Sequence, residues 1–265
     1  MAQFLWQDRD SKDYPYPFNP RPECLALIQR PPKVALDIGC GSGGVGHALR
    51  QRFPECALWG CEFDASAAAM ARQHFDQVVE QDVETVDFAA LGLTRPFDLI
   101  CLFDVLEHLV NPWKLLHGLQ RVSAPDAHAL VSLPNASNLL LLYDALRGHW
   151  RYRNYGLLDF THLRFFTDFD ARKMFYQTGW RVLDHRVDFL GQGAGIFERH
   201  RNEVFPLLLS VGDMSIAVKS QQELLRLCAD RNLYLIARHH GDFQDDAERS
   251  MACSDYPDTY AFGGG

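Results

Sequence analysis

Three side chains capable of acid–base or metal chemistry stand close together in FDVLEHL, residues 103–109. On a helical turn Asp104, Glu107 and His108 share one side, because positions i, i+3 and i+4 are neighbours there. Two carboxylates and an imidazole are plausible ligands for a metal ion. The same spacing also matches a capping box, with Asp104 as the N-cap and Glu107 three residues later. Both interpretations stay open at this point.

The elements that position these residues alternate between strand and helix. Short apolar runs predict strands at 33–39, 57–63, 76–82, 96–103, 128–134, 179–189 and 231–240. Helical spacing or end signals predict helices at 23–29, 43–53, 66–75, 111–122, 167–179 and 201–228. This order is typical of an α/β domain with a mostly parallel sheet covered on both faces. We expect an N-terminal arm with a short helix over 1–30, one domain over 31–240, and a disordered tail over 241–265.

The turn after the first strand, in VALDIGCGSGGVG, is rich in glycine. Gly39, Gly41 and Gly43 let the backbone approach a ligand closely, and the following helix offers free N–H groups. Glu62 ends the second strand, where an acidic residue accepts hydrogen bonds from ribose hydroxyls. The pattern therefore predicts a nucleoside ligand.

The acid that precedes these glycines decides between two nucleoside cofactors. Gly39, Gly41 and Gly44 also match the spacing of a dinucleotide-binding loop. Asp37, however, would repel a pyrophosphate and suits a cationic amino-acid group. This favours S-adenosylmethionine over NAD.

Together these motifs resemble a class I S-adenosylmethionine-dependent methyltransferase from about residue 33 to residue 238. The resemblance implies a Rossmann-like sheet of seven strands, mostly parallel, with helices on both faces and the last strand antiparallel. Asp37 would lie at the methionine end, Glu62 at the ribose, and Asp82 with Val83 at the adenine. Asp82 could instead cap a turn, and Phe103 could belong to the core. The full set of cofactor-binding residues implied in this way is Asp37, Gly39, Cys40, Gly41, Gly43, Glu62, Phe63, Asp82, Val83 and Phe103.

Within this superfamily, D/E-x-x-E-H followed by a later histidine resembles two metal-using branches, the ubiquinone-pathway O-methyltransferases and the small-RNA 2′-O-methyltransferases. The later histidine here is His162. The resemblance implies that Asp104, Glu107, His108 and His162 hold Mg²⁺ or Mn²⁺. Asp104 departs from the commoner glutamate and reaches less far. Because a hydroxyl must lose its proton, we take His108, His162 and Asp104 as candidate catalytic residues, with or without a metal.

The segment GLLDFTHLRFFT resembles bacterial methyltransferases that accompany glycosyltransferases in surface-polysaccharide and secondary-metabolite pathways. The arginines and aromatic rings before it could bind a sugar face and a phosphate, or could simply face water. We take Arg147, Trp150 and Arg164 as candidate substrate residues. The expected acceptor is a small molecule, such as a nucleotide- or lipid-linked sugar.

Composition narrows the class of protein. The net charge of −8 over 265 residues argues against nucleic acid as the partner. Seven cysteines without CxxC spacing indicate reduced thiols, and no window approaches the ~20 apolar residues of a membrane span. We therefore expect a cytoplasmic enzyme. An RNA 2′-O-methyltransferase, a quinone or phenol O-methyltransferase and a non-catalytic cofactor-binding partner remain as alternatives.

Overall fold

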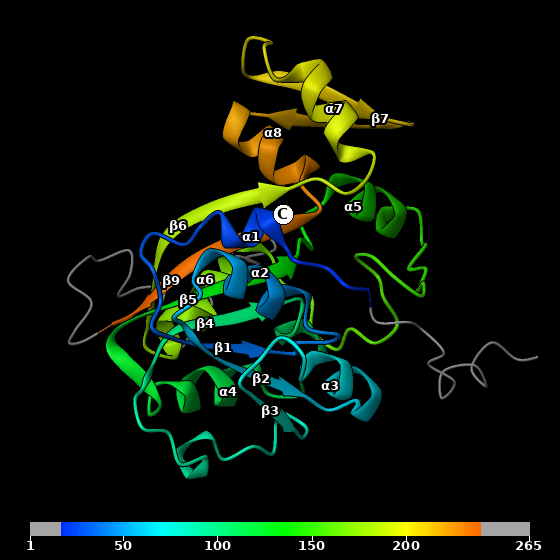
Figure 1. The fold of residues 1–265 in the computed structure, drawn as a ribbon. Helices are drawn as coiled ribbons and strands as arrows, with labels where there is room; N and C mark the ends of the chain where they lie inside the picture. Colours follow the sequence, from blue (N-terminus) through cyan, green and yellow to red (C-terminus); the bar gives the residue numbers. More distant parts are fainter. Residues whose placement is uncertain (1–16, 240–265) are drawn as a thin grey trace, which may run out of the picture.

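The computed structural model describes residues 17–239. Its main sheet has seven strands in the order β3-β2-β1-β4-β5-β9-β6 (Figure 1). Strand β9 runs antiparallel to both β5 and β6, and the other pairs are parallel. This confirms the predicted mostly parallel sheet with an antiparallel last strand. The strands of the sheet are β1 (Val34–Ile38), β2 (Ala57–Glu62), β3 (Gln77–Glu80), β4 (Phe97–Phe103), β5 (Ser123–Pro134), β6 (Trp180–Asp188) and β9 (Arg231–Arg238).

Helices cover both faces of this sheet. One apolar cluster joins the strands to α1 (Pro22–Leu25), α2 (Gly44–Arg52) and α3 (Ala65–Ala71). Another joins them to α4 (Pro112–Leu119) and α6 (Asp168–Gln177). Strands buried on both faces read as continuous apolar runs, which is why FDLICLF predicted a strand so clearly.

Local capping signals place the helix starts. The Asn111 side chain accepts a hydrogen bond from the Lys114 N–H, and Pro112 fixes the first residue of α4. The Thr167 hydroxyl accepts from the Asp170 N–H at the start of α6. Asp64 caps α3 in the same way. These three caps lie at or within two residues of the predicted helix starts at 66, 111 and 167.

The prediction of a continuous helical stretch over 201–228 was wrong. Strands β7 (Leu207–Val211) and β8 (Met214–Val218) form a hairpin there, between α7 (Gly193–His200) and α8 (Gln221–Cys228). The two strands are separated by Gly212 and Asp213, and Gly212 has a φ of 58°. Two apolar runs separated by a Gly-Asp pair are a hairpin signal, because glycine adopts the positive φ that the tight turn requires.

This hairpin belongs to a small unit at one end of the sheet. Figure 1 shows α7, α8 and β7 stacked together beyond β6 and α5 (Leu139–Leu146). An apolar cluster that includes Leu209, Val218 and Leu224 packs the unit against Leu139 of α5. The unit is an insertion in the chain between strands β6 and β9.

Parts of the predicted organisation lie outside the described residues. These are residues 1–16 of the expected arm and the tail over 241–265. The short helix expected at 23–29 is only one turn, α1. Among the residues described, no helix is long and apolar enough to cross a membrane. The six described cysteines are buried and form no disulfide.

Candidate functional site

The glycine loop after β1 closes one side of a cavity of about 430 Å³. Gly39, Gly41 and Gly43 have φ values of 68°, 52° and 94°. A Cβ on Gly39 would stand only 2.9 Å from the Cγ2 of Val105. The loop therefore requires glycine for its conformation and, at Gly39, for its packing against the turn after β4.

The cavity lies at the carboxyl edge of β1, β2 and β4, where ligands bind in open α/β folds. Five of the predicted cofactor residues line it, namely Gly39, Glu62, Phe63, Asp82 and Val83. Phe63 is exposed, as expected for the rim. Five others do not line it, namely Asp37, Cys40, Gly41, Gly43 and Phe103. The remaining lining residues are Cys61, Gln81, Glu84, Asp104, Val105, His108, Leu109 and Thr161.

Glu62 fastens the glycine loop to the second strand. One of its carboxylate oxygens accepts from the Gly41 N–H at 2.9 Å and the other from the Asp64 N–H at 3.0 Å. Each carboxylate oxygen keeps a further lone pair for a ligand. The side chain thus shapes the cavity as well as lining it.

Asp37 is buried beneath the glycine loop. It is 2 % exposed, and one of its carboxyl oxygens has no hydrogen-bond partner. Burial raises the pKa of Asp37 to about 8, Arg21 opposes this rise, and Glu62 adds to it. A buried carboxyl without a partner is costly unless a ligand provides one. Asp37 lies beneath the glycine loop and is not among the residues that line the cavity.

Asp104 does not cap a helix, so the capping-box interpretation was wrong. Only a 3₁₀ turn, η3 (Leu106–His108), follows β4, and its N-cap is Val105. Asp104 itself has a φ of 55°, a left-handed conformation that few non-glycine residues adopt. This conformation lets its carboxylate face two arginines instead of the turn.

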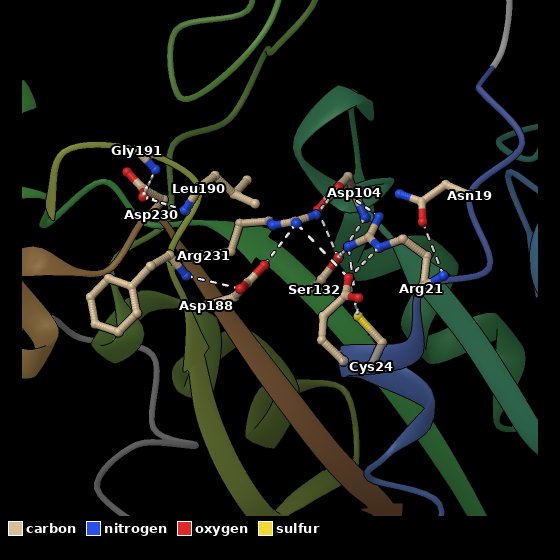
Figure 2. A network of polar contacts seen from close by, with 12 residues as sticks. Asn19, Arg21, Cys24, Asp104, Ser132, Asp188, Leu190, Gly191, Asp230 and Arg231 are labelled. Carbon is tan, nitrogen blue, oxygen red and sulfur yellow. Dashed lines mark hydrogen bonds and ion pairs between the residues drawn. The ribbon is translucent and has the colours of Figure 1, made fainter. Parts of the chain in front are cut away.

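Figure 2 shows Asp104 between Arg21 and Arg231. Each guanidinium approaches the same carboxylate oxygen, at 2.8 and 2.9 Å, and the Ser132 hydroxyl donates to the other oxygen at 2.7 Å. Burial alone would raise the pKa of Asp104, but the two arginines and Ser132 hold it below its usual range. Arg231 also pairs with Asp188 at the end of β6, at 2.8 Å. Asp104 therefore stays ionised and belongs to this network.

Glu107, His108 and His162 come together beside the cavity. One ligand atom from each lies within 4.8 Å of the others. Glu107 is 1 % exposed, and neither of its carboxyl oxygens has a hydrogen-bond partner. The two imidazole centroids are 4.7 Å apart. Three of the four predicted metal ligands thus converge, whereas Asp104 is held by the arginines.

The electrostatics of this cluster follow from burial. Burial, and then the charge of Asp104, raise the pKa of Glu107 well above its usual range. Burial lowers the pKa of both His108 and His162. The imidazoles are therefore neutral near pH 7, which is the form that acts as a base or binds a metal.

The candidate substrate residues lie apart from the cavity wall. Arg147 pairs at 2.6 Å with Asp213 in the β7–β8 turn. Arg164 donates to the Val110 carbonyl at 2.5 Å. Trp150 packs edge-on against Phe165, with centroids 5.4 Å apart. Both arginines thus have partners within the protein.

The sequence analysis missed several residues at this edge of the sheet: Arg21, Ser132, Asp159, Thr161 and Arg231. Arg21 is buried, although it stands between Pro20 and Pro22 in a segment without a hydrophobic run. Asp159 and Thr161 belong to the GLLDFTHLRFFT stretch, in which only His162 and Arg164 were predicted as site residues. The closeness of Asp159 and Thr161 to His162 in the sequence was the signal that could have identified them.

A family model described as "Methyltransferase domain" matches residues 13–185 of this chain. Among curated proteins, the ubiquinone biosynthesis O-methyltransferase of Azoarcus sp. (strain BH72) is 28% identical over 106 residues, 39% of this chain and 45% of the relative. That of Alkalilimnicola ehrlichii is 28% identical over 130 residues, 47% of this chain and 50% of the relative. The matches thus span about half the length of these relatives.

Solved structures agree in fold. "StiE O-MT residues 961-1257" has a TM-score of 0.54 at 13% identity and covers 88% of this chain and 77% of its own. The methyltransferase complexed with the Trm112 activator from Haloferax volcanii also has a TM-score of 0.54, at 14% identity, covering 90% of this chain and 96% of its own. At such identities the likeness concerns the fold alone.

Proposed function

Since the chain belongs to the methyltransferase family whose model matches more than half of it, we propose that it transfers a methyl group from S-adenosylmethionine to a hydroxyl oxygen of a small molecule. The observation that carries the choice of oxygen is the Glu107–His108–His162 cluster, which adjoins the cavity through His108. A hydroxyl is a poor acid, so its methylation requires a group that removes or stabilises its proton.

The cavity suits the proposed cofactor at both of its ends. S-adenosylmethionine supplies an electrophilic methyl group and carries an ammonium group. Asp37 has an unpartnered oxygen beneath the glycine loop and would be the complement for that cation, although it does not itself line the cavity. Glu62 and Asp82 line the cavity and would accept hydrogen bonds from the nucleoside, beside the apolar side chain of Val83.

A divalent metal ion also fits the cluster. Glu107 offers two buried oxygens without partners, and a carboxylate with two neutral imidazoles is a donor set that binds Mn²⁺ or Mg²⁺. Glu107, His108 and His162 would hold the ion, and Asp104 would not. When bound, the ion supplies positive charge that lowers the pKa of a neighbouring hydroxyl. Without it, an imidazole nitrogen of His108 takes the proton itself.

The acceptor we propose first is a sugar or a sugar-like molecule. Trp150, Tyr152 and Tyr155 have exposed rings that can stack on a sugar face, although none of the three lines the cavity. Because Arg147 and Arg164 are engaged within the protein, we assign any phosphate contact of such a substrate to Arg151 or Arg153, both exposed.

A quinone-like phenol is the second candidate acceptor. The curated relatives named as ubiquinone biosynthesis O-methyltransferases favour it, although they match only part of the chain. A catechol and a sugar diol share the feature that the cluster would recognise, two adjacent hydroxyls. The net charge of −8 makes RNA a weaker candidate.

The test combines turnover with binding. The purified chain is incubated with S-adenosylmethionine and Mn²⁺ against a panel of nucleotide sugars and catechols, and S-adenosylhomocysteine is measured. Glu107→Gln and His108→Ala are expected to lower turnover at least about 100-fold, because each removes a group that acts on the acceptor proton. The exposed Glu55→Gln is the matched control and should leave turnover unchanged.

Each outcome has a defined meaning. Turnover with a nucleotide sugar supports the first acceptor, and turnover with a catechol alone replaces it by the second. Cofactor binding without turnover of any acceptor would overturn the proposal and favour a non-catalytic cofactor-binding protein. Calorimetry with Mn²⁺ separates the two routes for the proton: loss of Mn²⁺ binding in Glu107→Gln supports the metal, and absence of binding in the parent chain leaves His108 as the base.

A further inference from the structure

The loop before α6 is fastened directly onto the turn that carries Glu107 and His108. The Glu107 carbonyl accepts hydrogen bonds from the N–H groups of Leu163 at 2.8 Å and Arg164 at 3.0 Å. Within the loop, the Asp159 carboxylate accepts from the N–H of Thr161 at 2.8 Å. This brings the side chains of Asp159, Thr161 and His108 into one hydrogen-bonded series.

The direction of each hydrogen bond in this series follows from its acceptors. A carboxylate oxygen accepts hydrogen bonds, so the Thr161 hydroxyl donates its single hydrogen to Asp159 Oδ1, at 2.7 Å. The same hydroxyl lies 3.0 Å from His108 Nδ1 and has only lone pairs left for it. The Thr161 carbonyl, 3.3 Å from Nδ1, also accepts only. Nδ1 of His108 must therefore carry the hydrogen.

The neighbouring histidine is fixed in the same sense. His162 Nδ1 faces the Leu157 carbonyl at 3.2 Å and must donate to it. Its Nε2 is directed toward Glu107, 3.9 Å from Oε1. Both imidazoles thus use Nδ1–H for the loop and leave Nε2 with its lone pair.

We propose that Asp159 and Thr161 are positioning residues that hold His108 in the Nδ1–H tautomer and in one ring orientation, so that its Nε2 lone pair is available to the reaction. The catalytic role of these two residues rests on the proposed function, whereas the tautomer of His108 does not depend on it. An unconstrained imidazole populates both tautomers, and in the Nε2–H form that nitrogen is neither a base nor a metal ligand. Partners that orient a functional histidine typically contribute 10–100-fold to affinity or activity.

The decisive measurement is the tautomer of His108 in the full chain. Long-range ¹H–¹⁵N correlation spectra of the histidine-labelled protein, at a pH where the imidazoles are neutral and without added metal, distinguish the two ring nitrogens. His108→Gln identifies the signal. We expect the parent chain and Thr161→Ser to show the Nδ1–H tautomer. In Thr161→Val a methyl group replaces the hydroxyl and only the longer carbonyl contact remains, so the Nε2–H form should become populated.

Asp159→Asn tests the far end of the series. An asparagine amide can donate to the Thr161 hydroxyl, which is then free to donate to Nδ1 and reverse the series. We expect this variant to populate the Nε2–H form too. Thr94→Val, at an exposed threonine before β4, is the matched control and should leave the spectrum unchanged. An unchanged His108 signal in Thr161→Val would overturn the proposal, and an unchanged signal in Asp159→Asn would remove Asp159 from it.

Kinetics provide the second readout. Thr161→Val should lower kcat by about 10–100-fold with the KM for S-adenosylmethionine unchanged, and Thr161→Ser should restore kcat. A loop that is merely unfolded would raise KM and would not be rescued by serine. If no acceptor is turned over at all, the proposed function fails while the tautomer result still stands or falls on its own spectrum.

Discussion

At the scale of single residues, three carboxyl groups organise this site in different ways. Asp104 is ionised between two arginines, neither Glu107 oxygen has a hydrogen-bond partner, and one Asp37 oxygen has none. The first is a completed structural network. The other two carboxyl groups are buried and keep oxygens that could accept a hydrogen bond or bind a cation. The unpartnered atoms therefore locate the chemistry better than the residue types alone.

The raised pKa of Asp37 predicts that cofactor binding is linked to pH. With a pKa of about 8, Asp37 is mostly protonated at pH 7 in the free protein. A cation bound beside it favours the ionised form, so binding releases up to one proton per molecule. Affinity should rise about tenfold per pH unit from pH 6 and level off near pH 8. Calorimetry in buffers of different ionisation enthalpy measures both effects.

The stability of the free folded protein has the opposite dependence on pH. Because its folded pKa is raised, Asp37 binds more protons in the folded than in the unfolded chain, and its contribution to stability is lost as pH rises toward 8. Asp37→Asn should abolish proton release and flatten the dependence of affinity on pH. A pH-independent affinity in the parent chain would contradict a buried, protonated Asp37.

At the scale of elements, side-chain hydrogen bonds connect the extra α7–β7–β8–α8 unit to the sheet. Asn138 caps α5 by accepting from the N–H groups of Leu140 and Leu141, and it donates to the Ala229 carbonyl just after α8. Asp230 accepts from the N–H groups at the other end of the unit, Leu190 and Gly191. The entry and exit of the unit are thus tied together beside the network in Figure 2.

Replacing Asn138 by alanine should lower the free energy of unfolding by about 2–4 kcal/mol. The variant loses a helix cap and leaves the buried Ala229 carbonyl with fewer donors. Asn111, an exposed N-cap at α4, is the matched control, and Asn111→Ala should cost only about 0.5–2 kcal/mol. Urea denaturation measures both. Equal losses would mean that the capping of α5 alone matters and that the link to α8 does not.

At the scale of the whole molecule, the sheet and the extra unit differ in how they are buried. Residues of the central strands, such as Ile100, Leu130 and Leu235, have no exposed surface. In the hairpin, Leu208 is 70% exposed. Backbone hydrogen bonds covered on both faces open only when much of the fold opens, whereas those near water open locally.

Hydrogen exchange should therefore separate the two regions. We expect the amides of β4, β5 and β9 to exchange most slowly and those of β7 and β8 distinctly faster. Peptide-resolved exchange followed by mass spectrometry measures this, and an added cofactor should slow exchange in the glycine loop without slowing the hairpin. Equal protection in β5 and β8 would instead show that the extra unit opens only together with the sheet.

The sequence by itself determined the α/β fold and the glycine-loop edge of the cavity, because these depend on local signals. Apolar runs, helix caps at Asn111 and Thr167, and glycines at positive φ act within a few residues of chain. The same local view failed at the β7–β8 hairpin, where an apolar stretch read as helix contained a tight turn at Gly212.

Only the tertiary structure decided what the carboxylates and histidines do. Asp104 turns to Arg21 and Arg231, which lie 83 and 127 residues away along the chain. His108 gains its orienting partner Thr161 across 53 residues. Such pairings depend on which elements meet at the carboxyl edge of the sheet and on the left-handed backbone at Asp104, and neither leaves a periodic signal in the sequence. For this reason the residue types of FDVLEHL were visible from the start, while their roles were not.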